Sequence, residues 1–184
     1  MSIVKFFRVV LAAAILFAGL TQTARADFRH LTGDTSTSPT FHRPTQSLLG
    51  LSADGTNVHY NTYTFQVSRS GSYNFYTTGL FDTFHLLYEG SFNPASPLTN
   101  AIAANDDLYS DTDTGTSGFY GLLESNTTYV FVITGYDNNS HGRYEALISG
   151  PGLITAVPEP SAYLMLGLGL AGIMLVSRRK NRQV

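Results

Sequence analysis

The sequence predicts an all-β protein whose central part folds as an antiparallel β-sandwich or jelly roll. Apolar and polar residues alternate in short segments from Val58 onward, and turn residues separate these segments at intervals of roughly 8 to 12 residues. No convincing amphipathic helix lies between the segments. Alternation with a period of two makes one face of each strand apolar, and two sheets bury such faces against each other.

The first two strands of this pattern predict a hairpin. Tyr63, Phe65 and Val67 share one face, and the alternation resumes at Tyr73 and Phe75 after a turn at residues 69–71. Five further strands are expected, at residues 84–88, 98–103, 119–123, 129–135 and 143–149. The segment at 129–135 is apolar on both faces, which is typical of the central strand of a sheet.

The amino-terminal residues 1–26 have the features of a secretory signal peptide, expected to be helical. Basic residues precede an apolar core of 12 residues, and Ala24 and Ala26 form the small-residue pattern at which such peptides are cut. We therefore expect the mature chain to begin at Asp27. An amino-terminal membrane anchor is the alternative, but this apolar core is shorter than a membrane span.

The mature chain divides into four parts. Residues 27–57 are rich in Thr, Ser, Pro and Gly and predict an irregular lead-in. Residues 58–152 hold the predicted strands, residues 153–157 predict a linker, and residues 158–184 form a carboxy-terminal segment. The part between the two ends is long enough for one domain with its own core.

The region between the signal peptide and the carboxy-terminal segment is acidic. It holds four basic and twelve acidic residues, a formal charge of −8, whereas the whole chain carries −2. Such a domain repels phosphate backbones, so we do not expect nucleic acid as a partner. The chain has no cysteine, which excludes disulfides, thiolate zinc sites and a cysteine nucleophile.

The carboxy-terminal segment has three parts in a defined order. It opens with Pro158, Glu159 and Pro160, and an apolar run follows at residues 162–176. Three basic residues then follow, Arg178, Arg179 and Lys180. As a transmembrane helix the run would cover about 22 Å of a hydrocarbon core about 30 Å thick, a marginal span with the basic end in the cytoplasm. The prolines keep the preceding chain extended and outside the helix.

This segment resembles the PEP-CTERM sorting signal of Gram-negative bacteria, in which a Pro-Glu-Pro motif, a hydrophobic helix and an Arg-rich end follow in the same order. The resemblance implies processing near the motif by an exosortase, a membrane cysteine transpeptidase or protease. It also implies transient residence in the inner membrane, followed by delivery to the cell surface or extracellular matrix. A plain single-pass anchor is the alternative, but mere anchoring has no use for the Pro-Glu-Pro motif.

Short segments of the central domain form a second pattern. They lie at residues 87–94, 104–107, 122–123, 128–132, 142–144 and 149–152, and the Asn-Asp-Asp and Gly-Arg-Tyr sequences are the most distinctive. These segments resemble the bacterial pre-peptidase C-terminal type of β-sandwich. The resemblance implies a binding or stability module of the kind that accompanies secreted enzymes and surface proteins.

Acidic residues gather after the segment at 98–103. Asp106 and Asp107 follow Asn105, and Asp111 and Asp113 come shortly afterwards. Carboxylate and amide oxygens are the ligands that Ca²⁺ prefers, so Asp106 and Asp107 are candidate Ca²⁺ ligands. The resemblance to calcium-binding sandwiches favours such a site, and a solvated acidic loop is the alternative. The order of the acids does not fit an EF-hand loop.

The motifs of the chain predict a non-enzymatic protein. Asp113 opens an Asp-Thr-Gly tripeptide, but an aspartic protease needs two such carboxylates. The five histidines form no His-x-x-x-His pair, His85 is expected to be a packed or surface residue, and no Gly-x-Ser-x-Gly elbow occurs. We expect an exported surface or matrix protein associated with biofilm or exopolysaccharide.

Two other functions remain open from the sequence. A secreted module could bind carbohydrate or Ca²⁺, with exposed aromatic rings stacking on sugars. The candidate rings are Tyr60, Tyr76, Tyr109, Tyr120 and Tyr136, for which packing in a core or interface is the alternative. A small secreted hydrolase is the third possibility, and it would need a nucleophile or acid pair that the motifs do not supply.

Overall fold

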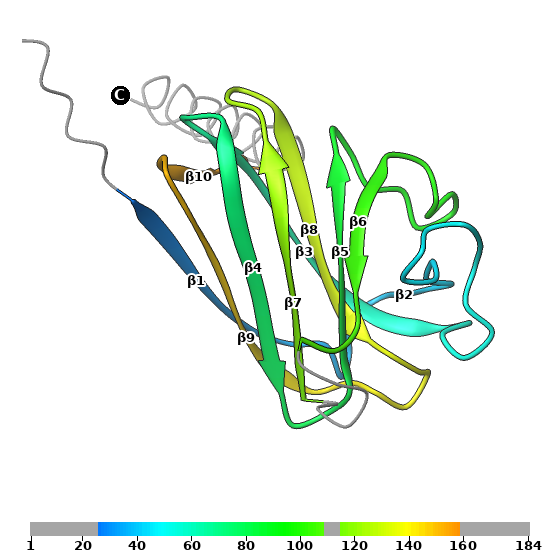
Figure 1. Ribbon diagram of the computed structural model, residues 1–184. Helices are drawn as coiled ribbons and strands as arrows, with labels where there is room; N and C mark the ends of the chain where they lie inside the picture. The colour runs from blue at the N-terminus through cyan, green and yellow to red at the C-terminus, as the bar shows by residue number, and fades with distance from the viewer. Residues whose placement is uncertain (1–25, 109–114, 159–184) are drawn as a thin grey trace, which may run out of the picture.

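The computed structural model describes residues 26–108 and 115–158, and these residues form an all-β structure (Figure 1). The strands are β1 (Asp27–Asp34), β2 (Thr40–Phe41), β3 (Val58–Val67), β4 (Gly71–Gly79), β5 (Thr83–Glu89), β6 (Ala101–Asn105), β7 (Thr116–Leu123), β8 (Thr128–Gly135), β9 (Arg143–Gly150) and β10 (Ile154–Ala156). In the part of the chain that is described, no helix is long and apolar enough to cross a membrane. The predicted signal helix and the predicted transmembrane helix at 162–176 lie outside the described residues.

The strands form two antiparallel sheets that pack face to face. One sheet has four strands in the order β1-β9-β4-β7. The other has six, in the order β10-β3-β8-β5-β6, with β2 paired to β3. Between the sheets, the ring of Phe75 on β4 lies 6.2 Å from Phe65 on β3 and 5.2 Å from Phe131 on β8, measured between ring centroids. The predicted antiparallel β-sandwich is therefore confirmed.

Strand β8 occupies the centre of the six-stranded sheet, as its apolar sequence predicted. It lies between β3 and β5, and every residue from Tyr129 to Gly135 is buried. Its inner face packs in the core between the sheets, whereas Val130 and Val132 belong to a second apolar cluster on the outer face. The segment that carries β2 helps to cover this outer face, because Phe41 joins the second cluster.

The predicted hairpin of β3 and β4 is wrong. The two strands follow each other in the chain but belong to opposite sheets, with β3 paired to β8 and β4 paired to β7 and β9. Residues 68–70 therefore cross from one sheet to the other. Apolar alternation shows which face of a strand is buried. It does not show whether the next strand pairs beside it in the same sheet or packs against it from the opposite sheet, because both arrangements bury the same face.

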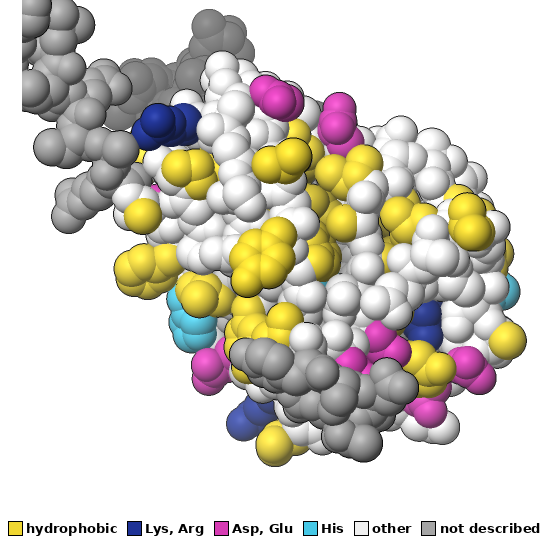
Figure 2. Space-filling model, viewed as in Figure 1, with side chains coloured by type: hydrophobic (Ala, Val, Ile, Leu, Met, Phe, Trp, Pro, Cys, Tyr) yellow, Lys and Arg dark blue, Asp and Glu magenta, His cyan; other side chains and the backbone are white. Residues whose placement is uncertain are grey.

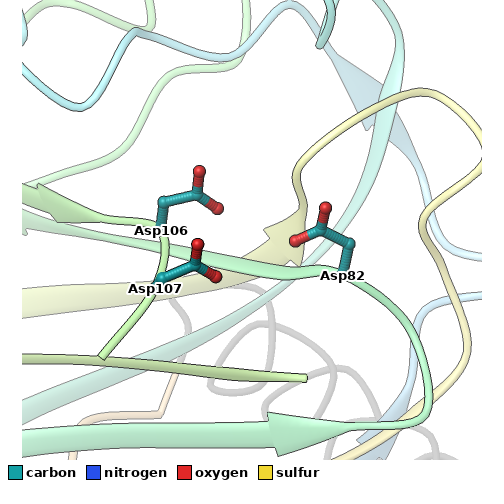
Figure 3. Close-up of side chains that lie close together, drawn as sticks. All are labelled: Asp82, Asp106 and Asp107. Carbon is teal, nitrogen blue, oxygen red and sulfur yellow. The ribbon is translucent and has the colours of Figure 1, made fainter. Parts of the chain in front are cut away.

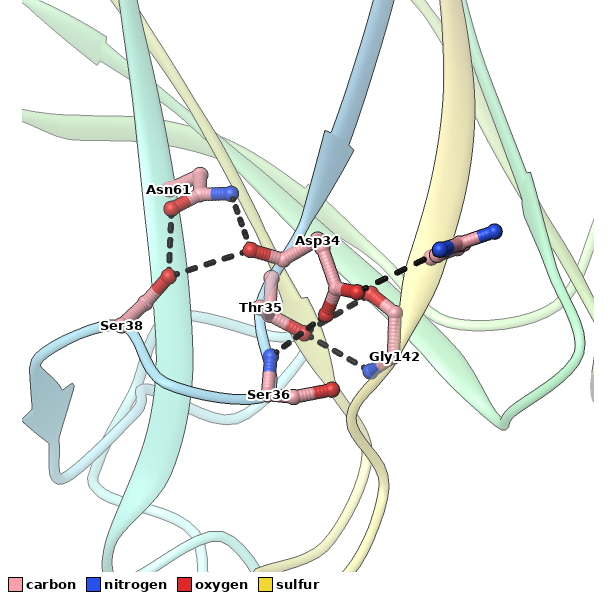
Figure 4. Close-up of polar contacts among 7 residues, drawn as sticks. Asp34, Thr35, Ser36, Ser38, Asn61 and Gly142 are labelled. Carbon is pink, nitrogen blue, oxygen red and sulfur yellow. Dashed lines mark hydrogen bonds and ion pairs between the residues drawn. The ribbon is translucent and has the colours of Figure 1, made fainter.

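The expected irregular lead-in at residues 27–57 is wrong in its first part, because β1 pairs with β9 along its whole length. Polar contacts then fix the chain after β1 (Figure 4). The Thr35 amide donates to the Gly142 carbonyl at 2.9 Å, the Gly142 amide donates to the Thr35 hydroxyl at 3.0 Å, and the Asn61 amide group donates to the Asp34 carbonyl at 3.1 Å. No residue of β1 is fully buried, so this edge strand leaves no apolar alternation in the sequence.

Within the predicted linker at 153–157, residues 154–156 form an edge strand. Strand β10 pairs with β3, and Ile154 is buried in the core between the sheets. The Val157 amide donates to the Thr64 carbonyl at 2.9 Å, which extends the pairing to the end of this segment. The Ile154 amide donates to the Asp27 carboxylate at 2.9 Å. The expected first residue of the mature chain thus contacts its last strand.

Candidate metal centre and sorting junction

Three carboxylates converge at one end of the sandwich (Figure 3). Asp82 lies in the turn between β4 and β5, and Asp106 and Asp107 directly follow β6. Strands β5 and β6 are antiparallel neighbours, so the beginning of β5 lies beside the end of β6. One oxygen from each of the three carboxylates lies within 4.8 Å of the others. We call these residues the acidic cluster.

The spacing of the acidic cluster fits a hard cation. Ca²⁺ binds oxygen at 2.3–2.6 Å, so two ligand oxygens on one ion lie at most about 5 Å apart. The three carboxylates meet this limit, and each can supply one or two oxygens. The buried Oδ1 of Asp82 accepts no hydrogen bond from the described residues, so it is available to a cation. The oxygen donors suit Ca²⁺ and lack the nitrogen and sulfur that zinc prefers.

The buried guanidinium of Arg43 lies close to the acidic cluster. Arg43 is 2% exposed, and its Cζ lies 4.0 Å from the ring centroid of Phe84 and 4.8 Å from that of Tyr136. Its Nε donates to the Tyr136 carbonyl at 2.8 Å, and its Nη1 donates to the Pro44 carbonyl at 3.0 Å. Burial lowers the pKa of Arg43, an effect that the charge of Asp106 opposes. Arg43 therefore partly compensates the acidic cluster.

The acidic cluster still carries an excess of negative charge. Burial, together with the charges of Asp107 and Asp137, raises the pKa of Asp82 to about 6, although Arg43 lowers it. Ionising all three carboxylates beside one another is unfavourable unless a cation joins them. Figure 2 shows Asp and Glu side chains along the lower part of the visible face, with others at its upper edge. The end of the sandwich that holds the cluster is thus suited to binding a cation.

The sequence identified two of the three members of this cluster. Asp106 and Asp107 lie in the cluster, and their role as Ca²⁺ ligands stays a prediction, whereas Asp111 and Asp113 lie outside the described residues. Asp82 was missed because it stands alone in the sequence. Its position just before β5, the partner of β6, would have indicated it once this pairing was known. His85 packs between the rings of Phe119 and Phe131, one of the two positions expected for it.

The carboxy-terminal junction begins directly at the edge of the sheet. Strand β10 ends at Ala156, and Pro158 is the second residue after it. At the other end, Ala26 immediately precedes β1. The remaining predicted residues at the two ends lie outside the described residues: Ala24, Glu159, Pro160, Arg178, Arg179 and Lys180.

A family model described as the PEP-CTERM protein-sorting motif matches residues 156–180. The chain carries a PEP-CTERM sorting motif. This motif starts at the last residue of β10, so the sorting motif and the folded sandwich meet without an intervening linker. The motif indicates an exported protein that is held transiently in a membrane and processed by an exosortase. Comparison with curated proteins finds no match.

The solved structures that resemble this chain are distant from it in sequence. The periplasmic inhibitor of g-type lysozyme from Aeromonas hydrophila is 12% identical, with a TM-score of 0.39, over 71% of this chain and 90% of its own. The pre-peptidase C-terminal domain of Bacillus anthracis collagenase is 15% identical, with a TM-score of 0.37, over 65% and 87%. A family 35 carbohydrate-binding module from Cellvibrio japonicus is 9% identical, with a TM-score of 0.37, over 71% and 99%. Similarities this low say nothing about ligand or activity.

Proposed function

We propose that this chain is a non-enzymatic protein of the cell surface or extracellular matrix, associated with biofilm or exopolysaccharide. Exosortase processing at Pro158, Glu159 and Pro160 would deliver it there. The observation that carries the proposal is the position of the sorting motif immediately after β10. A cut at the motif removes the carboxy-terminal segment and leaves the ten described strands in the product.

Intact-mass measurement of the secreted protein tests this proposal. We expect a product that begins at Asp27 and ends near the Pro-Glu-Pro motif. Glu159→Ala should prevent processing and leave the chain in the membrane fraction, whereas Glu124→Ala, in the turn between β7 and β8, should be processed normally. Recovery of a secreted chain that still ends at Val184 would contradict exosortase processing. Absence of the product from isolated extracellular matrix would contradict the proposed location.

We also propose that the acidic cluster binds Ca²⁺ and that the ion stabilises the end of the sandwich. Asp82, Asp106 and Asp107 would be its ligands, and the ion would join the turn before β5 to the end of β6. A ligand that binds only the folded state raises the free energy of unfolding by about 2.7 kcal/mol at a concentration 100 times its Kd. Millimolar Ca²⁺ should therefore raise the Tm, and a chelator should reverse the rise.

Single substitutions separate this site from a general salt effect. Asp82→Asn and Asp106→Asn should each abolish the rise in Tm caused by Ca²⁺. Glu145→Gln is the matched control, because Glu145 lies exposed on β9 outside the cluster, and it should respond like the wild type. A Tm that does not change in millimolar Ca²⁺ would rule the site out.

A second candidate function is polysaccharide binding on the outer face of the four-stranded sheet. The favouring observation is Tyr120 on β7, which is 79% exposed, with the half-buried Tyr76 on the neighbouring strand β4. Uncovered aromatic rings can stack on sugar rings. Binding to exopolysaccharide in a pull-down should be lost in Tyr120→Ala and retained in Leu80→Ala, and equal binding by both variants would exclude this face. Tyr136, by contrast, packs against Arg43.

A further inference from the structure

We propose that the end of the sandwich at which β1 begins and β10 lies is a docking surface for an anionic lipid bilayer. While the precursor is anchored, the domain would stand on the membrane on this end, with the acidic cluster facing away. This inference rests on the proposed export and anchoring, and adds to them the surface that meets the lipid. We call this end the proximal end and the end with the acidic cluster the distal end.

The first described strand begins at the proximal end, and β10, the last one, lies at the same end (Figure 1). Asp27 at the start of β1 pairs with Gly150 at the end of β9, and its carboxylate accepts the hydrogen bond from the Ile154 amide. The two predicted membrane-directed segments, the signal peptide and the sorting segment, are therefore attached at neighbouring points. The distal end lies at the opposite ends of the strands, where β4 ends and β5 begins.

The tether between the sandwich and the membrane is short. Strand β10 runs inward from the proximal end, so the Val157 amide donates to Thr64, three residues before β3 ends at Val67, and the predicted apolar run begins at residue 162. Five residue steps separate the two positions, and an extended chain covers at most about 17 Å over five steps. The proximal end is thus held near the lipid headgroups, where its surface chemistry decides whether it docks.

The proximal end exposes apolar and basic side chains. Phe28 on β1, Leu122 on β7 and Leu153 beside β10 are all exposed and lie within two residues of a strand terminus at this end. Arg29 and Arg69 are also exposed. Arg69 lies beside the start of β10, because its neighbour Ser68 exchanges hydrogen bonds with Leu153 at 2.9 and 3.0 Å. Apolar and basic groups together are what a bilayer interface with anionic lipid attracts.

The charges of the two ends differ. Among the described residues, seven carboxylates lie at or near the distal end: Asp34, Asp54, Asp82, Asp106, Asp107, Asp137 and Glu145. The guanidiniums of Arg43 and Arg143 offset two of them. The proximal end holds three carboxylates against Arg29 and Arg69. The Asp27 carboxylate accepts the Ile154 amide, Glu124 accepts the Ser70 hydroxyl at 2.8 Å, and Glu89 is exposed at the end of β5. An anionic membrane therefore repels the distal end more strongly and orients the domain with Arg29 and Arg69 toward the lipid.

Site-specific labelling tests the orientation. The chain has no cysteine, so one introduced cysteine carries one label. The full chain is reconstituted in vesicles of equal parts phosphatidylcholine and phosphatidylglycerol, with a fluorophore at Leu122→Cys or, as the control, at Leu80→Cys. Both positions are fully or largely exposed, and they lie at opposite ends. A nitroxide quencher at the lipid headgroup should quench the label at position 122 and leave the label at position 80 bright.

Charge-reversal variants provide a second test of the docking surface. Arg29→Glu combined with Arg69→Glu should lower the ratio of docked to undocked domains at least about tenfold, whereas Arg143→Glu at the distal end should not lower it. Equal quenching at positions 122 and 80, or quenching that survives the double reversal, would overturn the docking surface alone. A chain that alkaline carbonate strips from the vesicles would overturn the membrane anchor as well, and so separates the two failures.

Discussion

His85 shows how one buried side chain can make the stability of this protein depend on pH. Its ring is fully buried, with centroids of Phe119 and Phe131 at 4.8 and 5.2 Å, and its Nδ1 lies 3.0 Å from the Thr77 hydroxyl oxygen in a hydrogen bond. Burial lowers the pKa of His85 to about 3. The imidazole is therefore neutral in the folded protein, and protonation opposes folding.

We predict that this contribution to stability is lost in acid. An unfolded histidine has a pKa of about 6.5, so below that pH the unfolded state binds a proton that folded His85 does not. Relative to His85→Gln, which cannot be protonated, the wild type should lose about 1.4 kcal/mol of unfolding free energy per pH unit between about pH 6 and 4. Urea unfolding across this range measures the difference. His30→Gln, on exposed β1, should retain the slope, and a retained slope in His85→Gln would contradict the prediction.

At the distal end, loss of the Arg43 side chain should lower the free energy of unfolding more than any other single substitution. Arg43→Met removes a cation stacked between two rings and leaves the neighbouring carboxylates uncompensated, so the free energy of unfolding should fall by about 2 to 4 kcal/mol. Arg43→Lys should not restore it, because an ammonium lacks the planar group that stacks and donates in two directions. Thermal unfolding of both variants checks this expectation. The exposed control Arg143→Met should change the free energy of unfolding by less than about 0.5 kcal/mol.

At the scale of the element, β10 shows where the folded unit ends. A chain that stops after Val157 keeps Ile154 in the core, so we predict the same Tm as for the full-length protein. A chain that stops after Gly152 loses this side chain and leaves the edge of β3 uncovered, which should cost about 2 to 3 kcal/mol. Equal stability of the two truncated chains would show that residues 153–157 are the flexible linker that their sequence predicted.

The elements differ in how far the sequence alone could identify them. Strands β5 and β8 were predictable because buried strands fill with apolar residues. Strands β1 and β10 were not, since an edge strand is held by backbone pairing and by polar contacts such as those of Thr35. The cross-sheet path from β3 to β4 and the approach of Asp82 to the acidic cluster depend on strand order, which local patterns do not encode.

The two ends of the described sandwich differ, because β1 begins and β10 lies at one end and the acidic cluster lies at the other. We predict that lengthening the tether by about ten Gly and Ser residues between Val157 and Pro158 weakens membrane docking, because a longer tether lowers the effective concentration of lipid at the proximal end. Quenching of a label at position 122 should fall while the Tm stays unchanged. Quenching that is independent of tether length would show that docking does not depend on the short connection.

The contact between Asp27 and Ile154 has a consequence for the order of folding. During amino-terminal-first export, β1 emerges early, but its partner β9 follows more than a hundred residues later, and β10 is the last strand to cross. Pairings so distant in sequence close slowly. If the predicted signal peptide directs export, the sandwich would close only after β9 and β10 have crossed. The edge of β3 that pairs with β10 would then be covered last.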